Sequence, residues 1–111
     1  MKRKRLEPDT LEAVADRFKV LAEPARLAIL NALCAMPMSV TTLIDETRLS
    51  QANLSKHLQI LYTHGFVRRT RSQSWVYYEL ADKSTFQLCD IMCRQLKQHV
   101  AVRGHAVHAA K

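Results

Sequence analysis

Apolar residues recur at every third or fourth position along the first half of the chain, the spacing typical of amphipathic helices. One apolar stripe covers residues 11–22 and a second covers residues 27–33. Asp9, with Glu12 three residues later, is predicted to cap the first helix as a capping box. Pro24 suits the first position of the second helix. The chain therefore starts as two consecutive helices.

Two shorter segments follow Pro37, which is expected to end the second helix. Ser39 can cap a third helix, and Ser50 can cap a fourth helix over residues 51–64, with Gly65 as its C-terminal stop. Residues 48–50 would make a tight connection between the two helices. The inward face of the fourth helix is predicted to hold Leu54, Leu58 and Leu61.

The hydrophobic period changes after Gly65. Residues 66–70 and 75–80 favour two strands joined by a polar turn over residues 71–74. A last helix is expected over residues 84–102. The pattern predicts a mainly α fold of about five helices with a small β-hairpin. It forms one domain over residues 9–102, between a basic arm (1–8) and a short tail (103–111).

The charge balance favours a polyanionic partner. The 111 residues include 17 basic and 10 acidic side chains, a net charge of +7. Nucleic acid is the first expectation and an anionic membrane surface the second. No signal peptide and no run of about 20 apolar residues is visible, so we expect a cytoplasmic protein without a membrane partner. Three cysteines are an odd number, which suits reduced thiols.

The segment over residues 39–80 carries the strongest functional signal. A short helix, a tight turn, a second helix and a basic hairpin follow one another, as in a helix-turn-helix DNA-binding unit. Short polar side chains face outward on the helix over residues 51–64, where they could contact base edges in a major groove. A solvated helix face is the alternative. The hairpin favours DNA, because its cluster of Arg68, Arg69 and Arg71 suits phosphate contacts.

Three stretches, LAEPARLAILNAL, LSQANLSKHLQILYTHGFVRR and WVYYEL, resemble the ArsR/SmtB family of bacterial winged-helix repressors. The resemblance covers about residues 10–100. It implies a homodimer built on the first and last helices, and a recognition helix that reads an inverted repeat in double-stranded promoter DNA. The recognition-helix residues it implies are Ser50, Gln51, Asn53, Ser55, Lys56 and His57. Those of the hairpin, or wing, are Arg69, Arg71, Ser72, Gln73 and Ser74.

Some features leave alternatives open. Arg48 stands where glycine is common in the family's turn, and a left-handed turn there would cost arginine more than glycine, which leaves the exact turn geometry open. The wing turn also lacks a frequent glycine, so the wing tip is expected to be looser or longer. His57 either contacts DNA or holds the recognition helix in place. The basic run at residues 2–5 either follows the DNA backbone or minor groove, or is a solvated tail.

The resemblance also implies an inducer that releases the repressor from DNA: a metal, a metalloid, or a reactive sulfur or oxygen species. The family's cysteine box for arsenic or cadmium is missing from the third helix, which reads SVTTLIDET. Its zinc site on the last helix is incomplete, because Asp82 is present but Ser84 and Gln95 stand near the expected histidines. The remaining weak metal ligands are His99, His105 and His108, and a histidine-bearing flexible tail is the favoured interpretation.

Cys34, Cys89 and Cys93 are the best effector candidates. Cys89 and Cys93 are four residues apart and share one helix face. Some sensors of this family use one thiol on the second helix and one on the last, and Cys34 could pair with either. Three thiolates could instead bind As(III) or another soft metal ion. The remaining alternative is that the thiols are small apolar core residues and no inducer site uses them.

An enzyme is not expected. The chain has no C-x-x-C motif, no cysteine-containing phosphate loop, and no paired carboxylates or nucleophile–base set. A protein-binding or membrane-surface module is the other alternative, because the amphipathic terminal helices could pair with a partner. Steep weakening of binding by salt would distinguish DNA binding from such an apolar interface.

Overall fold

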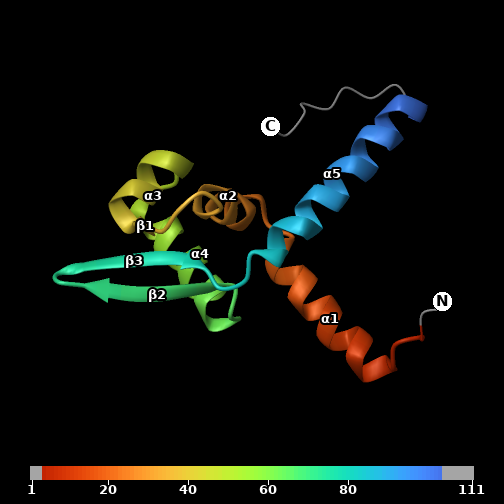
Figure 1. The fold of residues 1–111 in the computed structure, drawn as a ribbon, viewed down its shortest axis with the longest axis horizontal. Helices are drawn as coiled ribbons and strands as arrows, with labels where there is room; N and C mark the ends of the chain where they lie inside the picture. The colour runs from red at the N-terminus through yellow and green to blue at the C-terminus, as the bar shows by residue number, and fades with distance from the viewer. Residues whose placement is uncertain (1–3, 104–111) are drawn as a thin grey trace. The chain divides into compact units, whose positions relative to one another are not determined.

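The computed structural model describes residues 4–103 of the chain. This part contains five helices and three short strands, joined by turns and loops (Figure 1). The chain divides into two compact units, Met1–Ala81 and Asp82–Lys111. The first unit holds α1 (Pro8–Leu21), α2 (Pro24–Leu33), β1 (Met38–Ser39), α3 (Val40–Thr47), α4 (Gln51–Thr63), β2 (Val67–Ser72) and β3 (Trp75–Leu80). The second holds α5 (Ser84–Arg103). This confirms the mainly α fold with a β-hairpin.

Serine caps begin both helices of the helix-turn-helix, as predicted. The Ser39 hydroxyl accepts a hydrogen bond from the Thr42 N–H (3.3 Å) at the start of α3. The Ser50 hydroxyl accepts one from the Asn53 N–H (3.2 Å) at the start of α4. Each bond satisfies a backbone donor that the helix itself leaves without a partner.

The start of α1 differs from the prediction. Pro8 is its first residue, so Asp9 lies inside the first turn and the predicted capping box does not form. Proline has a φ suited to the first helical position and no N–H there to satisfy, which favours the earlier start. Helix α2 also ends earlier than Pro37 suggested, at Leu33, with Cys34 as its C-cap residue.

The strands form one antiparallel sheet in the order β1-β3-β2. The two residues of β1 were not predicted, because a strand this short shows no alternation. The hairpin of β2 and β3 is the wing, and its turn is tighter than predicted. Strand β2 continues to Ser72, directly opposite Trp75. Only residues 73–74 form the turn, and Gln73 takes the left-handed φ of 57° that makes such a short turn possible without glycine.

Arg48 confirms the strain expected at the helix-turn-helix connection. Its φ of 62° is left-handed, and its N–H donates to the Ile44 carbonyl (2.9 Å) at the end of α3. Gly65 has the same kind of backbone after α4, with a φ of 77°. Arg48 therefore adopts a backbone conformation that costs arginine more than glycine.

The core of the first unit lies where α2, α3 and α4 meet. Its most deeply buried side chains are Ile29, Leu30, Leu43, Leu54, Leu58 and Leu61. Leu27, the first residue of the apolar stripe predicted for α2, is 39% exposed. On α1 only Val20 and Leu21 are buried, while Leu11 and Phe18 remain about half exposed.

Helix α5 forms the described part of the second unit. The Asp82 carboxylate accepts a hydrogen bond from the Ser84 N–H (2.9 Å), which lowers the pKa of Asp82 and caps the helix. Among the α5 side chains that the structure describes, the exposed large apolar ones are Leu88, Ile91, Met92 and Leu96. Within residues 4–103, no helix is long and apolar enough to span a membrane. His105 and His108 lie outside the described residues.

Candidate nucleic-acid interface

Helix α4 separates its apolar and polar residues onto two faces. Leu54, Leu58 and Leu61 are at most 2% exposed, so this side is fixed in the core. The opposite side is exposed and carries Ser50, Gln51, Asn53, Ser55 and Lys56. These are the predicted DNA-contacting residues of this helix, with the exception of His57.

The N-terminal end of α4 suits an anionic partner. Gln51 and Asn53 lie in its first turn, which contains no acidic side chain. The helix dipole adds partial positive charge at this end, and Lys56 adds a full charge one turn further. The exposed amide side chains can both donate and accept hydrogen bonds, as base edges require.

His57 differs from its exposed neighbours, because it is partly buried against α2. Its Nδ1 lies 3.2 Å from an Nη of Arg26, and the Arg26 Nε donates to the Val20 carbonyl (2.6 Å). Arginine only donates, so His57 must accept at Nδ1 and be neutral. Burial lowers the pKa of His57, and the charge of Arg26 lowers it further. This geometry favours the alternative in which His57 holds the recognition helix in place.

The tip of the wing is exposed and polar. Arg71, Ser72, Gln73 and Ser74, all predicted DNA contacts, lie together around the two-residue turn. Trp75 follows them and is 53% exposed. Trp75 was not among the predicted DNA contacts, although it directly follows the polar turn in the sequence.

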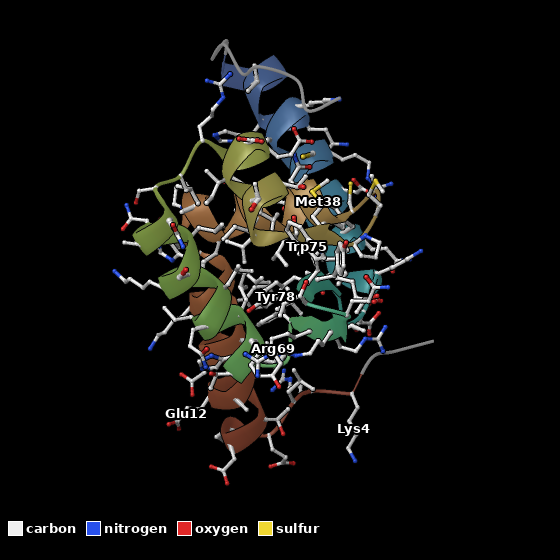
Figure 2. All side chains as sticks on the ribbon, turned by 90° about the vertical axis from the view of Figure 1, so that its left-hand side faces the viewer. Lys4, Glu12, Met38, Arg69, Trp75 and Tyr78 are labelled. Atoms are coloured by element: carbon white, nitrogen blue, oxygen red, sulfur yellow. The ribbon has the colours of Figure 1, made fainter. Side chains whose placement is uncertain are left out.

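The remaining wing arginines have partners within the first unit. Arg68 forms an exposed ion pair with Glu79 (3.3 Å), its cross-strand neighbour. The Arg69 guanidinium lies over the ring of Tyr62, 4.2 Å from its centroid, and so contacts α4. The neighbouring side chains of Tyr78 and Tyr62 raise the pKa of Arg69. Figure 2 shows Arg69 beside α4, with Tyr78 next to it.

Arg17 connects α1 with the end of α4, a contact that the sequence did not reveal. Its Nη1 donates to the His64 carbonyl (3.0 Å), and its guanidinium lies over the Phe66 ring at 4.1 Å. A cation at the C-terminal end of a helix is favoured by the helix dipole. Helix α1 is thereby tied to the turn that follows the recognition helix.

The effector candidates are distributed over both units. Cys34 is exposed at the C-cap of α2, and Cys89 and Cys93 are partly buried on α5. Burial raises the pKa of the Cys89 thiol, and the neighbouring Cys93 and Asp90 raise it further. Among the side chains that the structure describes, no three His, Cys, Asp or Glu residues gather into a metal-binding group. His99 lies on α5.

The comparison with known proteins decides the family. A model of the family described as "Bacterial regulatory protein, arsR family" matches residues 23–69, from the start of α2 into β2. The HTH-type transcriptional regulator MJ1325 of Methanocaldococcus jannaschii is 36% identical over 72 residues, 64% of this chain and 81% of that protein. The chain belongs to the ArsR family of bacterial regulatory proteins.

A second relative carries the name of a repressor. The SmtB repressor homolog of Synechocystis is 32% identical over 80 residues, which are 72% of this chain. The match spans 61% of that protein, and it spans 55% of the SmtB repressor of Mycobacterium tuberculosis. The ArsR-family relatives are named transcriptional regulators and repressors, so this chain is a regulator and not an enzyme.

Two solved structures share the fold over nearly the whole chain. The crystal structure of Mycobacterium tuberculosis Rv0081 superposes with a TM-score of 0.79 at 30% identity, covering 90% of this chain and 100% of that one. A winged helix-turn-helix DNA-binding domain of Mb0332 from Mycobacterium bovis, described as homodimeric, superposes with a TM-score of 0.70 at 25% identity and covers 96% of both chains. The winged helix-turn-helix fold is therefore confirmed.

Proposed function

We propose that this ArsR-family repressor binds an inverted-repeat operator as a homodimer in the cytoplasm. The observation that carries the proposal is the two-sided character of α4, whose leucines are buried while Gln51, Asn53 and Lys56 are exposed. Each recognition helix enters a major groove, and each wing tip contacts flanking phosphates through Arg71 and the polar turn. The net charge of +7 supports the electrostatic part of this binding.

The homodimer would use the apolar faces of α1 and α5. Leu11 and Phe18 on α1 are 52% and 50% exposed, and α5 has four exposed apolar side chains. Surfaces of this kind favour burial against a partner. The homodimeric Mb0332 domain, which has the same fold, supports a second copy of this chain as that partner. The two recognition helices of the proposed dimer would then contact DNA half-sites. The half-sites would lie one helical turn of DNA apart, or a multiple of that distance.

Substitution of Gln51 tests base recognition. The operator is first selected from a random duplex library, and binding is followed by the fluorescence anisotropy of labelled DNA. Gln51→Ala should weaken operator binding by about 1–3 kcal/mol and leave unrelated DNA almost unaffected, because a base contact carries sequence information. Gln59→Ala is the matched control, since Gln59 is exposed on the same helix about two turns beyond Gln51 and donates to the Thr63 hydroxyl (3.2 Å). Equal losses on both DNAs would show that Gln51 contacts no base.

We further propose that cysteine chemistry releases the repressor. The pairing expected from the sequence is a disulfide that an oxidant forms between Cys34 and either Cys89 or Cys93. The exposure of Cys34 supports its reaction with an oxidant. With a peroxide, two thiols lose two hydrogens to form one disulfide, and the peroxide is reduced to two waters. A polysulfide could instead supply two sulfane sulfur atoms: one bridges the two cysteines as a trisulfide, and the other is reduced and leaves as hydrogen sulfide with the two thiol hydrogens. The alternatives are binding of As(III) or another soft metal ion by the thiolates, or no cysteine-based inducer site.

Intact mass separates these possibilities. The reduced protein is treated with peroxide, a polysulfide donor or arsenite, and operator binding is measured on the same samples. A loss of two hydrogens or a gain of sulfur, together with DNA release, would support thiol sensing. A gain of one arsenic with release would support the metalloid alternative. Cys34→Ser and Cys93→Ser show which thiols take part. Unchanged mass and DNA binding would exclude both.

A further inference from the structure

We infer that Arg69 is a positioning residue that fixes the wing to the recognition helix, and that Arg71 is the wing arginine that binds phosphate. The inference rests on the proposed DNA-binding function. The sequence predicted that both Arg69 and Arg71 contact DNA, whereas we assign the phosphate contact to Arg71 alone. Its physical basis is the stacking of the Arg69 guanidinium on Tyr62, at 4.2 Å from the ring centroid.

Strand register determines which arginine reaches α4. Opposite residues in an antiparallel pair lie on one face of the sheet, so the pairs Val67–Leu80, Arg69–Tyr78 and Arg71–Val76 share a face. Val67 and Leu80 are buried, which shows that this face points to the core at its base. Arg69 is the next residue outward and meets Tyr62 in the last turn of α4.

Arg71 lies two residues further along the same face, about 7 Å beyond Arg69 along the strand. It is exposed beside the turn, and the structure gives it no ion pair, hydrogen bond or ring contact among the described residues. Its guanidinium is therefore available for a phosphate. The two arginines share charge and strand but have different surroundings.

Two tyrosines surround Arg69. Its guanidinium lies over the Tyr62 ring of α4, and Tyr78 stands directly opposite it on β3. Arg68 does not duplicate this link, because it pairs with Glu79 inside the wing and lies on the opposite face of the hairpin. The stacked arginine therefore makes a side-chain connection from the wing to α4.

This link explains how the wing could be aligned with the recognition helix before DNA is bound. Within residues 4–103, β1 pairs only with Tyr77 and Tyr78, so no third strand lies beside the outer part of the hairpin in this part of the chain. Rotation at the wing base would displace Arg71 relative to the phosphates while α4 stays in its groove. Stacking of Arg69 on Tyr62 opposes that rotation and lowers the ordering cost of binding.

Trp75 supplies a direct reporter of wing mobility. It is the only tryptophan in the chain, lies on β3 beside the turn and is half exposed. Figure 2 shows it away from α4, unlike Arg69. The fluorescence anisotropy of Trp75 in the free full-length protein therefore reports the hairpin without any DNA. This readout remains valid even if the proposed DNA-binding function is wrong.

The experiment compares Arg69→Gln with Arg71→Gln, a matched loss of one charge from the same face. Arg69→Gln should lower the anisotropy of Trp75 and weaken operator binding by about two- to fivefold, while the slope of log affinity against log salt stays unchanged. Arg71→Gln should leave the anisotropy unchanged and flatten the slope by about 0.9, the value for one lost phosphate contact.

Tyrosine variants separate stacking from charge. Tyr62→Phe keeps the ring and should behave as wild type, whereas Tyr62→Leu should reproduce the effects of Arg69→Gln without changing any cationic residue. If the Arg69→Gln variant does not fold, the comparison of Tyr62→Phe with Tyr62→Leu still tests the inference. A flatter salt slope for Arg69→Gln would overturn the inference, and so would unchanged Trp75 anisotropy in both Arg69→Gln and Tyr62→Leu. Failure of wild type to prefer operator DNA would instead contradict the proposed function.

Discussion

Helices α4 and α5 both carry an apolar stripe at helical spacing, but the stripes have different surroundings. On α4, Leu54 and Leu61 are fully buried, whereas Leu88 and Leu96 on α5 are 44% and 45% exposed. The core of the first unit covers the stripe of α4. The stripe of α5 remains available to a partner, as its proposed role in the homodimer requires. A stripe therefore predicts that a helix has an apolar face, but not which molecule covers it.

The largest expected effect is on the free energy of unfolding, and it tests the difference in packing between α4 and α5. Leu54→Ala should lower the free energy of unfolding by about 2–5 kcal/mol, because it leaves a cavity in a closely packed core. Leu96→Ala should change it by about 0.5 kcal/mol or less at protein concentrations low enough to keep the chain monomeric. Urea denaturation followed by circular dichroism measures both. Equal losses would show that α5 is as fully packed within one chain as α4.

The next effect tests the proposed partner of α5. Leu96→Glu should weaken dimerisation by about 2 kcal/mol, or roughly 30-fold, because a carboxylate would be placed in an apolar interface. Gln95→Glu adds the same charge to a neighbouring exposed position and should have little effect. Sedimentation equilibrium gives the dimer dissociation constants. If both variants dimerise like wild type, α5 is not part of the dimer interface.

A smaller effect concerns pH and the position of α4. The pKa of His57 is lowered in the folded protein, so the unfolded chain binds more protons as pH falls below the ordinary histidine value of about 6.5. The stabilising contribution of neutral His57 is therefore complete above that pH and is lost below it. His57→Gln should make the unfolding free energy less dependent on pH between 5 and 7. Gln59→Ala, on the same helix, should keep the wild-type dependence.

The smallest expected effect concerns the rates at which the individual thiols are alkylated. Burial raises the pKa of Cys89, so little of it is thiolate at neutral pH. Iodoacetamide should modify the exposed Cys34 faster than Cys89 at pH 7.5, and the rate at Cys89 should rise steeply only at higher pH. Peptide mass spectrometry over time measures each rate. Faster alkylation of Cys89 than of Cys34 would contradict this order and would favour a reactive thiol on α5.

Local interactions explain why much of the fold was predictable. Ser39 and Ser50 each cap a helix through a backbone N–H three residues later, so the helix-turn-helix is visible in short stretches of sequence. The wing was also predicted, but its turn was placed too broadly, because the left-handed backbone of Gln73 has no glycine to signal it. Strand β1 was missed because two residues form a strand only where β3 offers a partner.

The sequence by itself determined the helix-turn-helix, the wing and the polar face of α4, since these follow from hydrophobic period, capping and charge. Only the tertiary structure decided what the arginines do. Arg17 reaches a carbonyl 47 residues away, and Arg26 reaches a histidine 31 residues away. Arg69 and Arg71 look alike in sequence, yet only Arg69 meets Tyr62. A charged side chain takes its role from the groups that folding places around it, and those groups are distant in the chain.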